Sequence, residues 1–198
     1  LRRDPAKLPP YRVELKDDAV LQGHSHRPHS AADKAVIEEV FGELIDKGNL
    51  VKIYDAQFSS PIHVERQPNR DPRLVIDFRR LNTNVKFFER PVQGCAQRIR
   101  ALLPKCKVFS TFDLTKGYYQ LPMDPSCQHY FAIRCHMGTF QPTRLLMGDS
   151  NAVGYFHNVI GVVFKDVNGL VHYIDDVVIG SENDEEHLET LEHFFDLC

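Results

Sequence analysis

Residues 170–179 read Leu-Val-His-Tyr-Ile-Asp-Asp-Val-Val-Ile, and two adjacent acids, Asp175 and Asp176, divide this apolar stretch. The residues on both sides favour β-structure, so the stretch predicts a hairpin of two buried strands with the aspartates in the turn at its tip. Two like charges this close disfavour joint ionisation unless a cation lies nearby. Because hard divalent cations prefer oxygen ligands, the pattern indicates a metal site at the tip of the hairpin.

A third acid, Asp113, stands in a similar setting. It ends the β-type run Val-Phe-Ser-Thr-Phe at residues 108–112, far enough along the chain to lie on a neighbouring strand. Three carboxylates placed in this way can hold two metal ions roughly 3.5–4 Å apart, an arrangement suited to phosphoryl transfer. Each element alone also has an ordinary structural interpretation, because aspartates are common in turns. Other parts of the sequence are therefore needed to decide between a metal site and ordinary turn aspartates.

The hydrophobic pattern predicts a mixture of helices and strands. A helix is expected from its N-cap Ser30 to the stop at Lys47 and Gly48, with further helices at about 93–103, 150–163 and 182–198, the last capped by Ser181. Short strands are expected at 50–53, 61–64, 74–78, 107–113, 117–121 and 129–136. Helices and strands do not alternate regularly, so the predicted fold class is α+β, with an antiparallel sheet and helices on one face.

Composition narrows the class of protein. The 198 residues are 42% hydrophobic and 26% charged, which is typical of a soluble globular protein, and no stretch is long and apolar enough to predict a membrane span. The five cysteines are odd in number and form no C-x-x-C motif, so free thiols and an intracellular setting are expected. His24, His26 and His29 form H-x-H-x-x-H, which we interpret as a solvated loop rather than a metal site, since no nearby Cys or acid completes it.

Charge is distributed unevenly along the chain. The net charge is −3, but residues 66–107 contain eleven Lys and Arg against three acids, whereas residues 182–198 contain seven acids and no Lys or Arg. A basic middle segment can contact phosphates even when the whole chain is acidic. A merely solvated basic surface explains the same composition, so charge alone leaves both interpretations open.

Ordered motifs resemble those of the reverse transcriptases of gypsy-like long-terminal-repeat retrotransposons. Tyr-Ile-Asp-Asp at 173–176 matches Y-x-D-D, and Thr-Phe-Asp-Leu-Thr-Lys-Gly-Tyr-Tyr-Gln-Leu at 111–121 resembles F-D-L-x-x-G-Y-x-Q-[IL]. Upstream, Ser-Pro at 60–61 and Arg-Leu-Val-Ile-Asp-Phe-Arg-Arg-Leu-Asn at 73–82 resemble S-P…R-x-x-x-D-[FY]-R-x-L-N. The motifs occur in family order from about residue 35 onward, and such an ordered set is far more specific than any one of them.

The resemblance implies an RNA-directed DNA polymerase core that extends a primer by a two-metal mechanism. Asp113, Asp175 and Asp176 would be the catalytic and metal-binding acids, with two Mg²⁺ ions as cofactors and Mn²⁺ as the alternative. Residues 1–30 would form an irregular N-terminal extension, 31–107 mainly the fingers and 108–198 mainly the palm, the two interleaving, with thumb and ribonuclease H absent.

The resemblance also implies ligands and partners. Expected partners are an RNA or DNA template with its primer, deoxynucleoside triphosphates, and the other polyprotein domains (thumb, ribonuclease H and integrase), in the cytoplasm, including virus-like particles, or in the nucleus, with no membrane. Nucleotide contacts are expected from six residues: Arg73 at the triphosphate, Leu114 through a backbone carbonyl offered to a metal, Tyr118 as a steric gate against a ribose 2′-hydroxyl, and Met147, Gly148 and Arg66.

Some positions depart from the family pattern. Residues 140–153 align with Y-x-W-T-R-M-P-F-G-L-x-N-A-P and keep Gly148, but Met147 stands where the pattern has an aromatic residue. In the finger loop Gln67 replaces the lysine expected to reach the phosphate, so Arg66 or Arg70 would have to substitute. These changes support an alternative function, a non-catalytic reverse-transcriptase-like nucleic-acid-binding or scaffold module. A palm-type nucleotidyl cyclase lacks support from the finger motif and Tyr118.

Overall fold

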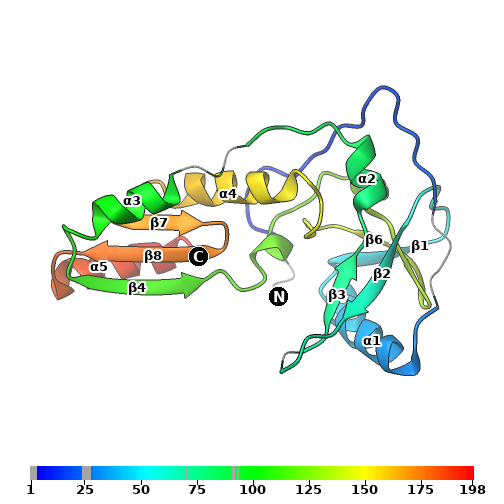
Figure 1. Ribbon diagram of the computed structural model, residues 1–198, viewed down its shortest axis with the longest axis horizontal. Helices are drawn as coiled ribbons and strands as arrows, with labels where there is room; N and C mark the ends of the chain where they lie inside the picture. Colours follow the sequence, from blue (N-terminus) through cyan, green and yellow to red (C-terminus); the bar gives the residue numbers. More distant parts are fainter. Residues whose placement is uncertain (1–3, 24–27, 70, 91, 93) are drawn as a thin grey trace. The chain divides into compact units, whose positions relative to one another are not determined.

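The computed structural model describes residues 4–23, 28–69, 71–90, 92 and 94–198. The chain forms two compact units, each built from two stretches of sequence: unit 1 is Leu1–Phe88 with Tyr118–Ala152, and unit 2 is Glu89–Gly117 with Val153–Cys198. Figure 1 shows the helices and strands, coloured along the sequence.

Unit 1 contains a five-stranded sheet with the strand order β1-β6-β5-β2-β3. Its strands are β1 (Leu50–Ile53), β2 (Ser60–Glu65), β3 (Arg73–Ile76), β5 (Ile133–Cys135) and β6 (Gly138–Pro142). All neighbouring strands are antiparallel except β2 and β5, which run parallel. The strands β1, β2 and β3 were predicted to within two residues.

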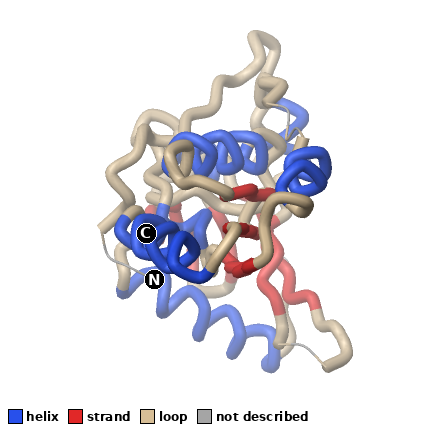
Figure 2. Tube along the Cα trace, turned by 90° about the vertical axis from the view of Figure 1, so that its left-hand side faces the viewer, coloured by secondary structure: helices blue, strands red, loops and turns tan. Residues whose placement is uncertain are grey.

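Helix α1 (Ala31–Asp46) packs against β1, β2 and β3 and lies at the bottom of Figure 2. The predicted cap is confirmed, because Ser30 Oγ accepts the N–H of Asp33 at 3.1 Å. The predicted stop is confirmed as well: Gly48 follows the helix at a φ of 71°, a conformation that glycine adopts without steric cost. The apolar stripe of the helix buries Ile37, Phe41 and Leu44.

Several predictions for unit 1 were wrong. Residues 117–121 are not a strand but form the 3-10 helix η1 (Gly117–Gln120), and the strand expected at 129–136 begins as the 3-10 helix η2 (Gln128–Phe131) before β5. In both places the apolar runs favoured β-structure. The backbone N–H and C=O groups instead form hydrogen bonds in turns and isolated β-bridges. The short helix α2 (Arg79–Asn84) and strand β6 were not predicted.

Unit 2 contains a three-stranded antiparallel sheet with the order β4-β8-β7. The strands are β4 (Val108–Asp113), β7 (Leu170–Tyr173) and β8 (Asp176–Ser181); the helices are α3 (Cys95–Leu102), α4 (Ala152–Val163) and α5 (Asp184–Asp196). In Figure 1 the strands lie side by side with α5 behind them. The phenyl ring of Phe194 on α5 stacks on Phe112 of β4 at a centroid distance of 5.0 Å. The predicted cap of α5 was wrong by two residues, because Asn183, not Ser181, accepts the N–H of Glu186.

The N-terminal segment has no helix or strand over residues 4–23, yet it packs into unit 1. Tyr11 and Val13 are fully or almost fully buried. Two isolated β-bridges, Tyr11 with Met123 and Leu15 with Val85, attach the segment to the body of the unit. All five cysteines are free, as expected. The histidine motif lies partly outside the described residues, since His24 and His26 are among those the structure does not describe.

Candidate active site

The hairpin between β7 and β8 carries the adjacent aspartates. Tyr173 and Asp176 are the last paired residues, so the two-residue turn is Ile174–Asp175 and Asp176 is the first residue of β8. The prediction that both aspartates form the turn was therefore wrong by one position. Ile174 adopts a φ of 59°, which is unfavourable for a β-branched residue. Strained backbone of this kind persists only where neighbouring structure imposes it.

Asp113 and Asp176 lie directly opposite each other on β4 and β8. Directly opposed residues of an antiparallel pair project from the same face of the sheet, with Cβ atoms about 4.5–5.5 Å apart. Both side chains are exposed, and Asp175 is half-buried in the adjoining turn. The Leu114 N–H also donates to the Asp175 carbonyl at 2.9 Å, which fixes the end of β4 to the turn. Acids that are distant in sequence thus share one end of the three-stranded sheet.

The donor set at this end suits a hard divalent cation. The Asp113 carboxylate accepts one hydrogen bond, from the Thr115 hydroxyl at 3.1 Å. Within the described residues, no Lys, Arg or His forms an ion pair with Asp113, Asp175 or Asp176. Uncompensated carboxylates at one location, offering only oxygen, are the ligands that Mg²⁺ uses. Across the part of the chain that the structure describes, no three Asp, Glu, His or Cys side chains already converge as a metal-binding group.

The backbone carbonyl of Leu114 was expected to face a metal. It accepts the Gly117 N–H at 2.9 Å, so one of its two lone pairs is used in the turn and one is left. Gly117 cannot be replaced easily, because a Cβ there would lie 2.8 Å from the Phe156 ring. Close packing of the turn against α4 therefore sets the backbone that follows Asp113.

Two histidines that sequence reasoning missed support the hairpin. The Ile174 N–H donates to His157 Nδ1 at 3.4 Å, and the His157 and His172 rings lie 4.3 Å apart. Burial, helped by the nearby Arg98 charge, lowers the pKa of His157. Burial, then the His157 and Arg98 charges, lowers the pKa of His172 to about 4. No sequence signal would have found them, because one histidine in a helical pattern and one in a strand are ordinary.

The remaining predicted contact residues, apart from Leu114, lie in unit 1. Arg73 is exposed at the start of β3, opposite Glu65. The Arg66 guanidinium is hydrogen-bonded to the carboxylate of Asp33 in the first turn of α1, and this bond lowers the pKa of Asp33. Tyr118 is buried in η1, whereas Met147 is 54% exposed.

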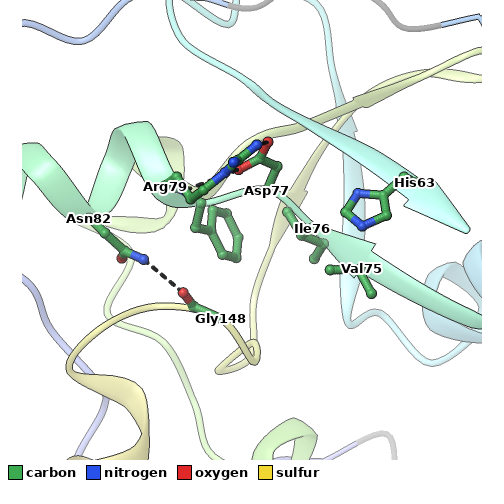
Figure 3. A pocket seen from close by; sticks show the side chains of 8 residues that line it. His63, Val75, Ile76, Asp77, Arg79, Asn82 and Gly148 are labelled. Carbon is green, nitrogen blue, oxygen red and sulfur yellow. Dashed lines mark hydrogen bonds and ion pairs between the residues drawn. The ribbon is translucent and has the colours of Figure 1, made fainter. Parts of the chain in front are cut away.

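A cavity of about 590 Å³ lies in unit 1 next to Gly148 (Figure 3). It is lined by His63, Val75, Ile76, Asp77, Phe78, Arg79, Asn82 and Gly148. Arg79 donates two hydrogen bonds to the buried Asp77 carboxylate, from Nε at 2.8 Å and from an Nη at 2.7 Å. Asn82 donates to the Gly148 carbonyl at 2.9 Å and accepts the Ser150 N–H at 3.0 Å. Asp77, Arg79 and Asn82 therefore hold this part of the unit together.

Gly148 occupies a position that only glycine fits well. Its φ is 105°, and a Cβ there would lie 3.4 Å from the ring of Phe78. The loop continues to Asn151, whose side chain donates to the Lys86 carbonyl at 3.0 Å and accepts the Phe88 N–H at 2.8 Å. Residues 147–151, here called the Gly148 loop, are thus anchored to the chain at residues 82 and 86–88.

The sequence matches a known protein family, in agreement with the fold and the opposed acids. The family model described as Reverse transcriptase (RNA-dependent DNA polymerase) matches residues 64–198. The chain therefore belongs to the reverse transcriptase family, a family of nucleotidyltransferases, as its motifs predicted. None of the helices that the structure describes has the length and apolar character that a membrane span requires.

Several curated relatives are Pol polyproteins. The chain is 25% identical to the Pro-Pol polyprotein of Simian foamy virus type 1 over 170 residues, which are 86% of this chain and 15% of that protein. It is 32% identical to the Pol polyprotein from transposon gypsy of Drosophila melanogaster over 126 residues, covering 63% and 12% of the two chains. The polyprotein from transposon opus of the same organism is 29% identical over 171 residues, covering 83% and 17%. The chain thus spans less than a fifth of these relatives, and the gypsy-like resemblance is confirmed.

Solved structures share the fold. The Prototype Foamy Virus protease–reverse transcriptase superposes with a TM-score of 0.84 at 22% identity, covering 98% of this chain and 26% of that one. A foamy viral protease–reverse transcriptase in complex with an RNA/DNA hybrid gives a TM-score of 0.83 at 24% identity, with the same coverage. The predicted α+β fold of the reverse transcriptase type is therefore confirmed.

Proposed function

We propose that this chain is the fingers and palm of an RNA-directed DNA polymerase that adds deoxynucleotides to the 3′ end of a primer. The observation that carries the proposal is the pairing of Asp113 with Asp176 across β4 and β8, with Asp175 in the adjoining turn. Ionised carboxylates placed this close together repel one another unless a cation neutralises their charge. In this proposal residues 31–107 form mainly the fingers and residues 108–198 mainly the palm, and the two interleave.

The acids act as ligands for two Mg²⁺ ions, with Mn²⁺ as the alternative. Metal ions bound there would make the primer hydroxyl more acidic. They would also stabilise the negative charge of the triphosphate and of the leaving group. Asp113 and Asp175 hold both ions, Asp176 supports the site, and the free lone pair of the Leu114 carbonyl offers one more ligand. The hydrogen bond from Leu114 to the Asp175 carbonyl keeps these ligands in a fixed arrangement before substrate binds.

Residues of unit 1 supply the nucleotide contacts in this proposal. Arg73 is exposed and its guanidinium suits phosphate, because its donors form a rigid fork. Tyr118 is the steric gate that favours deoxynucleotides in this proposal, which requires its buried ring to become accessible to the sugar, while Met147 and Gly148 contact the nucleotide. Arg66 would join the triphosphate only by exchanging its bond to Asp33, so it contributes less than Arg73.

The nucleic-acid partner in this proposal is an RNA or DNA template with a base-paired primer. The structural neighbours include one in complex with double-stranded DNA and one in complex with an RNA/DNA hybrid. The basic segment 66–107 gives the chain positive charge for phosphate contacts, so we expect binding to weaken as salt rises. Thumb, ribonuclease H and integrase domains of a polyprotein are the proposed protein partners, in the cytoplasm or the nucleus.

Primer extension tests the proposal. The natural full-length chain that contains these residues is given an RNA template, a DNA primer, deoxynucleotides and Mg²⁺, and is compared with an Asp175→Asn, Asp176→Asn double variant. The matched control is Asp46→Asn with Asp55→Asn, two exposed aspartates elsewhere. Extension by the wild type and the control, and none by the Asp175/Asp176 variant, is expected. Equal extension by all three would overturn the assignment of the acids.

A second candidate function is a non-catalytic nucleic-acid-binding or scaffold module. The engagement of Arg66 by Asp33 and the presence of Gln67 favour it, because both remove cations from the expected triphosphate site. Failure of the folded wild type to extend a primer that it still binds would support this function over the polymerase.

A further inference from the structure

The buried contact between Tyr11 and Asp149 joins the N-terminal segment to the Gly148 loop. The Tyr11 hydroxyl donates a hydrogen bond to Asp149 Oδ2, which also accepts the Asn151 N–H at 3.2 Å. Tyr11 is 0% exposed and Asp149 is 3% exposed. An acid buried this deeply within a loop needs partners, because unpaired burial of a carboxylate is strongly unfavourable.

The backbone of the N-terminal segment fixes the position of the tyrosine. The Tyr11 N–H donates to the Pro122 carbonyl, and the Asp124 N–H donates to the Tyr11 carbonyl, both at 2.8 Å. These bonds form the β-bridge between Tyr11 and Met123. The hydroxyl is therefore presented to Asp149 from a fixed backbone, as a positioning device requires.

Ring packing makes a second connection to the same loop. Tyr11 contacts Phe131 edge-on at a centroid distance of 6.3 Å, and Phe131 contacts Phe78 edge-on at 5.4 Å. Phe78 in turn lies against Gly148, close enough that a Cβ at Gly148 would be 3.4 Å from its ring. The segment that carries Tyr11 thus reaches the Gly148 loop through a hydrogen bond and through packed rings.

We propose that Tyr11 is a positioning residue for the Gly148 loop, so that the N-terminal segment is part of the nucleotide-binding apparatus. This inference rests on the proposed function, in which Met147 and Gly148 contact the incoming nucleotide. Tyr11 touches neither the nucleotide nor the acids in this proposal. It acts by holding Asp149, two residues beyond Met147, in one orientation.

The electrostatics of the pair show why the hydroxyl matters. Burial raises the pKa of Asp149, and the Tyr11 hydrogen bond opposes that rise. Asp149 Oδ1 is buried and has no hydrogen-bond partner among the described residues. The carboxylate therefore depends on its Oδ2 partners, and without Tyr11 it would tend to turn toward water and carry the loop with it.

The first test uses Tyr11→Phe, which removes one oxygen atom and keeps the ring contacts. Tyr54→Phe is the matched control, because Tyr54 is 89% exposed in the same unit. The measurement is hydrogen exchange of the amides at residues 148–152 in the natural full-length chain. Exchange should be about tenfold faster in Tyr11→Phe, because a hydrogen bond to a charged group is lost, and unchanged in the control.

The second test measures primer extension at varied deoxynucleotide concentration. In Tyr11→Phe the KM for the nucleotide should rise about tenfold while kcat changes less than twofold, because the loop positions the nucleotide and not the acids. Asp149→Leu replaces the carboxylate by an apolar side chain of similar size. In that background Tyr11→Phe should add little further change in KM, because two apolar partners need no hydrogen bond.

Each result has a defined meaning. Unchanged exchange in Tyr11→Phe, or faster exchange with an unchanged KM, would overturn the positioning role. Equal effects of Tyr11→Phe in both backgrounds would overturn the coupling to Asp149. A wild type that extends no primer would count against the proposed polymerase function, and the exchange measurement would still decide whether Tyr11 holds the loop.

Discussion

The Ile174 N–H donates a hydrogen bond to His157 Nδ1 across 3.4 Å, and this bond connects α4 to the turn that carries Asp175. Ile174 is held there at a φ of 59°, a conformation that an isoleucine would not adopt in isolation. The bond to His157 and the bond from Leu114 to the Asp175 carbonyl lie on either side of the peptide that joins residues 174 and 175. Together they hold the acid-bearing turn in its strained form.

Replacing His157 by leucine should slow catalysis. The variant keeps the size of the side chain but removes the acceptor for the Ile174 N–H, so the turn and Asp175 lose a support. We expect kcat for primer extension to fall about five- to tenfold, the value of one hydrogen bond, with little change in the nucleotide KM. His157→Gln, which retains an acceptor, should keep most of the activity. Wild-type kcat in the leucine variant would show that the bond does not matter.

His172 should make the fold sensitive to acid. Its pKa is lowered to about 4 by burial and by the His157 and Arg98 charges, and its Nδ1 has no hydrogen-bond partner within the described residues. A histidine whose pKa is depressed on folding contributes stability that is fully present above its unfolded value and is lost as the pH falls through the folded value. The free energy of unfolding should therefore drop by about 2–3 kcal/mol between pH 7 and about pH 4.5 on account of His172 alone.

Denaturant unfolding of the wild type and of His172→Phe at both pH values measures this contribution. The variant should lose less stability on acidification than the wild type, because its ring cannot bind a proton. His193→Phe on the outer surface of α5 is the control and should behave as the wild type. Parallel pH profiles for the wild type and His172→Phe would contradict the prediction.

Ile174→Gly should raise stability rather than lower it. Glycine removes the steric cost of the positive φ, which is about 1–3 kcal/mol for a non-glycine residue, although it adds entropy to the unfolded chain. We expect a net gain of about 1 kcal/mol in the free energy of unfolding. Val178→Gly, on the neighbouring strand β8, should destabilise the protein, as glycine usually does in a strand. A loss of stability in Ile174→Gly would mean that packing of the isoleucine outweighs its strain.

Asn82→Ala should weaken nucleotide binding in the proposed polymerase. The substitution removes both hydrogen bonds that tie α2 to the Gly148 loop, and these should be worth about 1–2 kcal/mol of unfolding free energy. Thermal unfolding measures that loss, and steady-state kinetics should show a higher KM for the deoxynucleotide. Thr83→Ala, at the next position in α2 with its side chain exposed, is the control. An unchanged KM in Asn82→Ala would show that the loop does not depend on this anchor.

The sequence motifs predicted the family, the fold class and the strands next to Asp113, Asp175 and Asp176, because these depend on patterns local to each stretch. The position of the turn was missed by one residue, since nothing in the sequence marks an isoleucine for a positive φ. The strand expected at 117–121 was wrong because a short apolar run does not distinguish a strand from a 3-10 turn. His157 and His172 were missed because neither stands in a motif.

The packing of the N-terminal segment was likewise not predictable from the sequence. Residues 4–23 lack any periodic apolar pattern, so the sequence indicated only an irregular extension. In the structure, Tyr11 is fully buried and bonded to Asp149, 138 positions along the chain. A contact between residues so far apart leaves no local pattern for either residue to display.

What the sequence determined by itself was the family and the strands that lead to Asp113 and to the turn of Asp175 and Asp176, because strand propensity and motif spacing are local properties of the chain. Only the tertiary structure decided that Asp113 faces Asp176, that Ile174 takes a strained conformation, and that Tyr11 and His157 are hydrogen-bonded to Asp149 and Ile174. These outcomes depend on the pairing register of strands and on side chains that meet only after folding, and both are set by the packing of the whole unit.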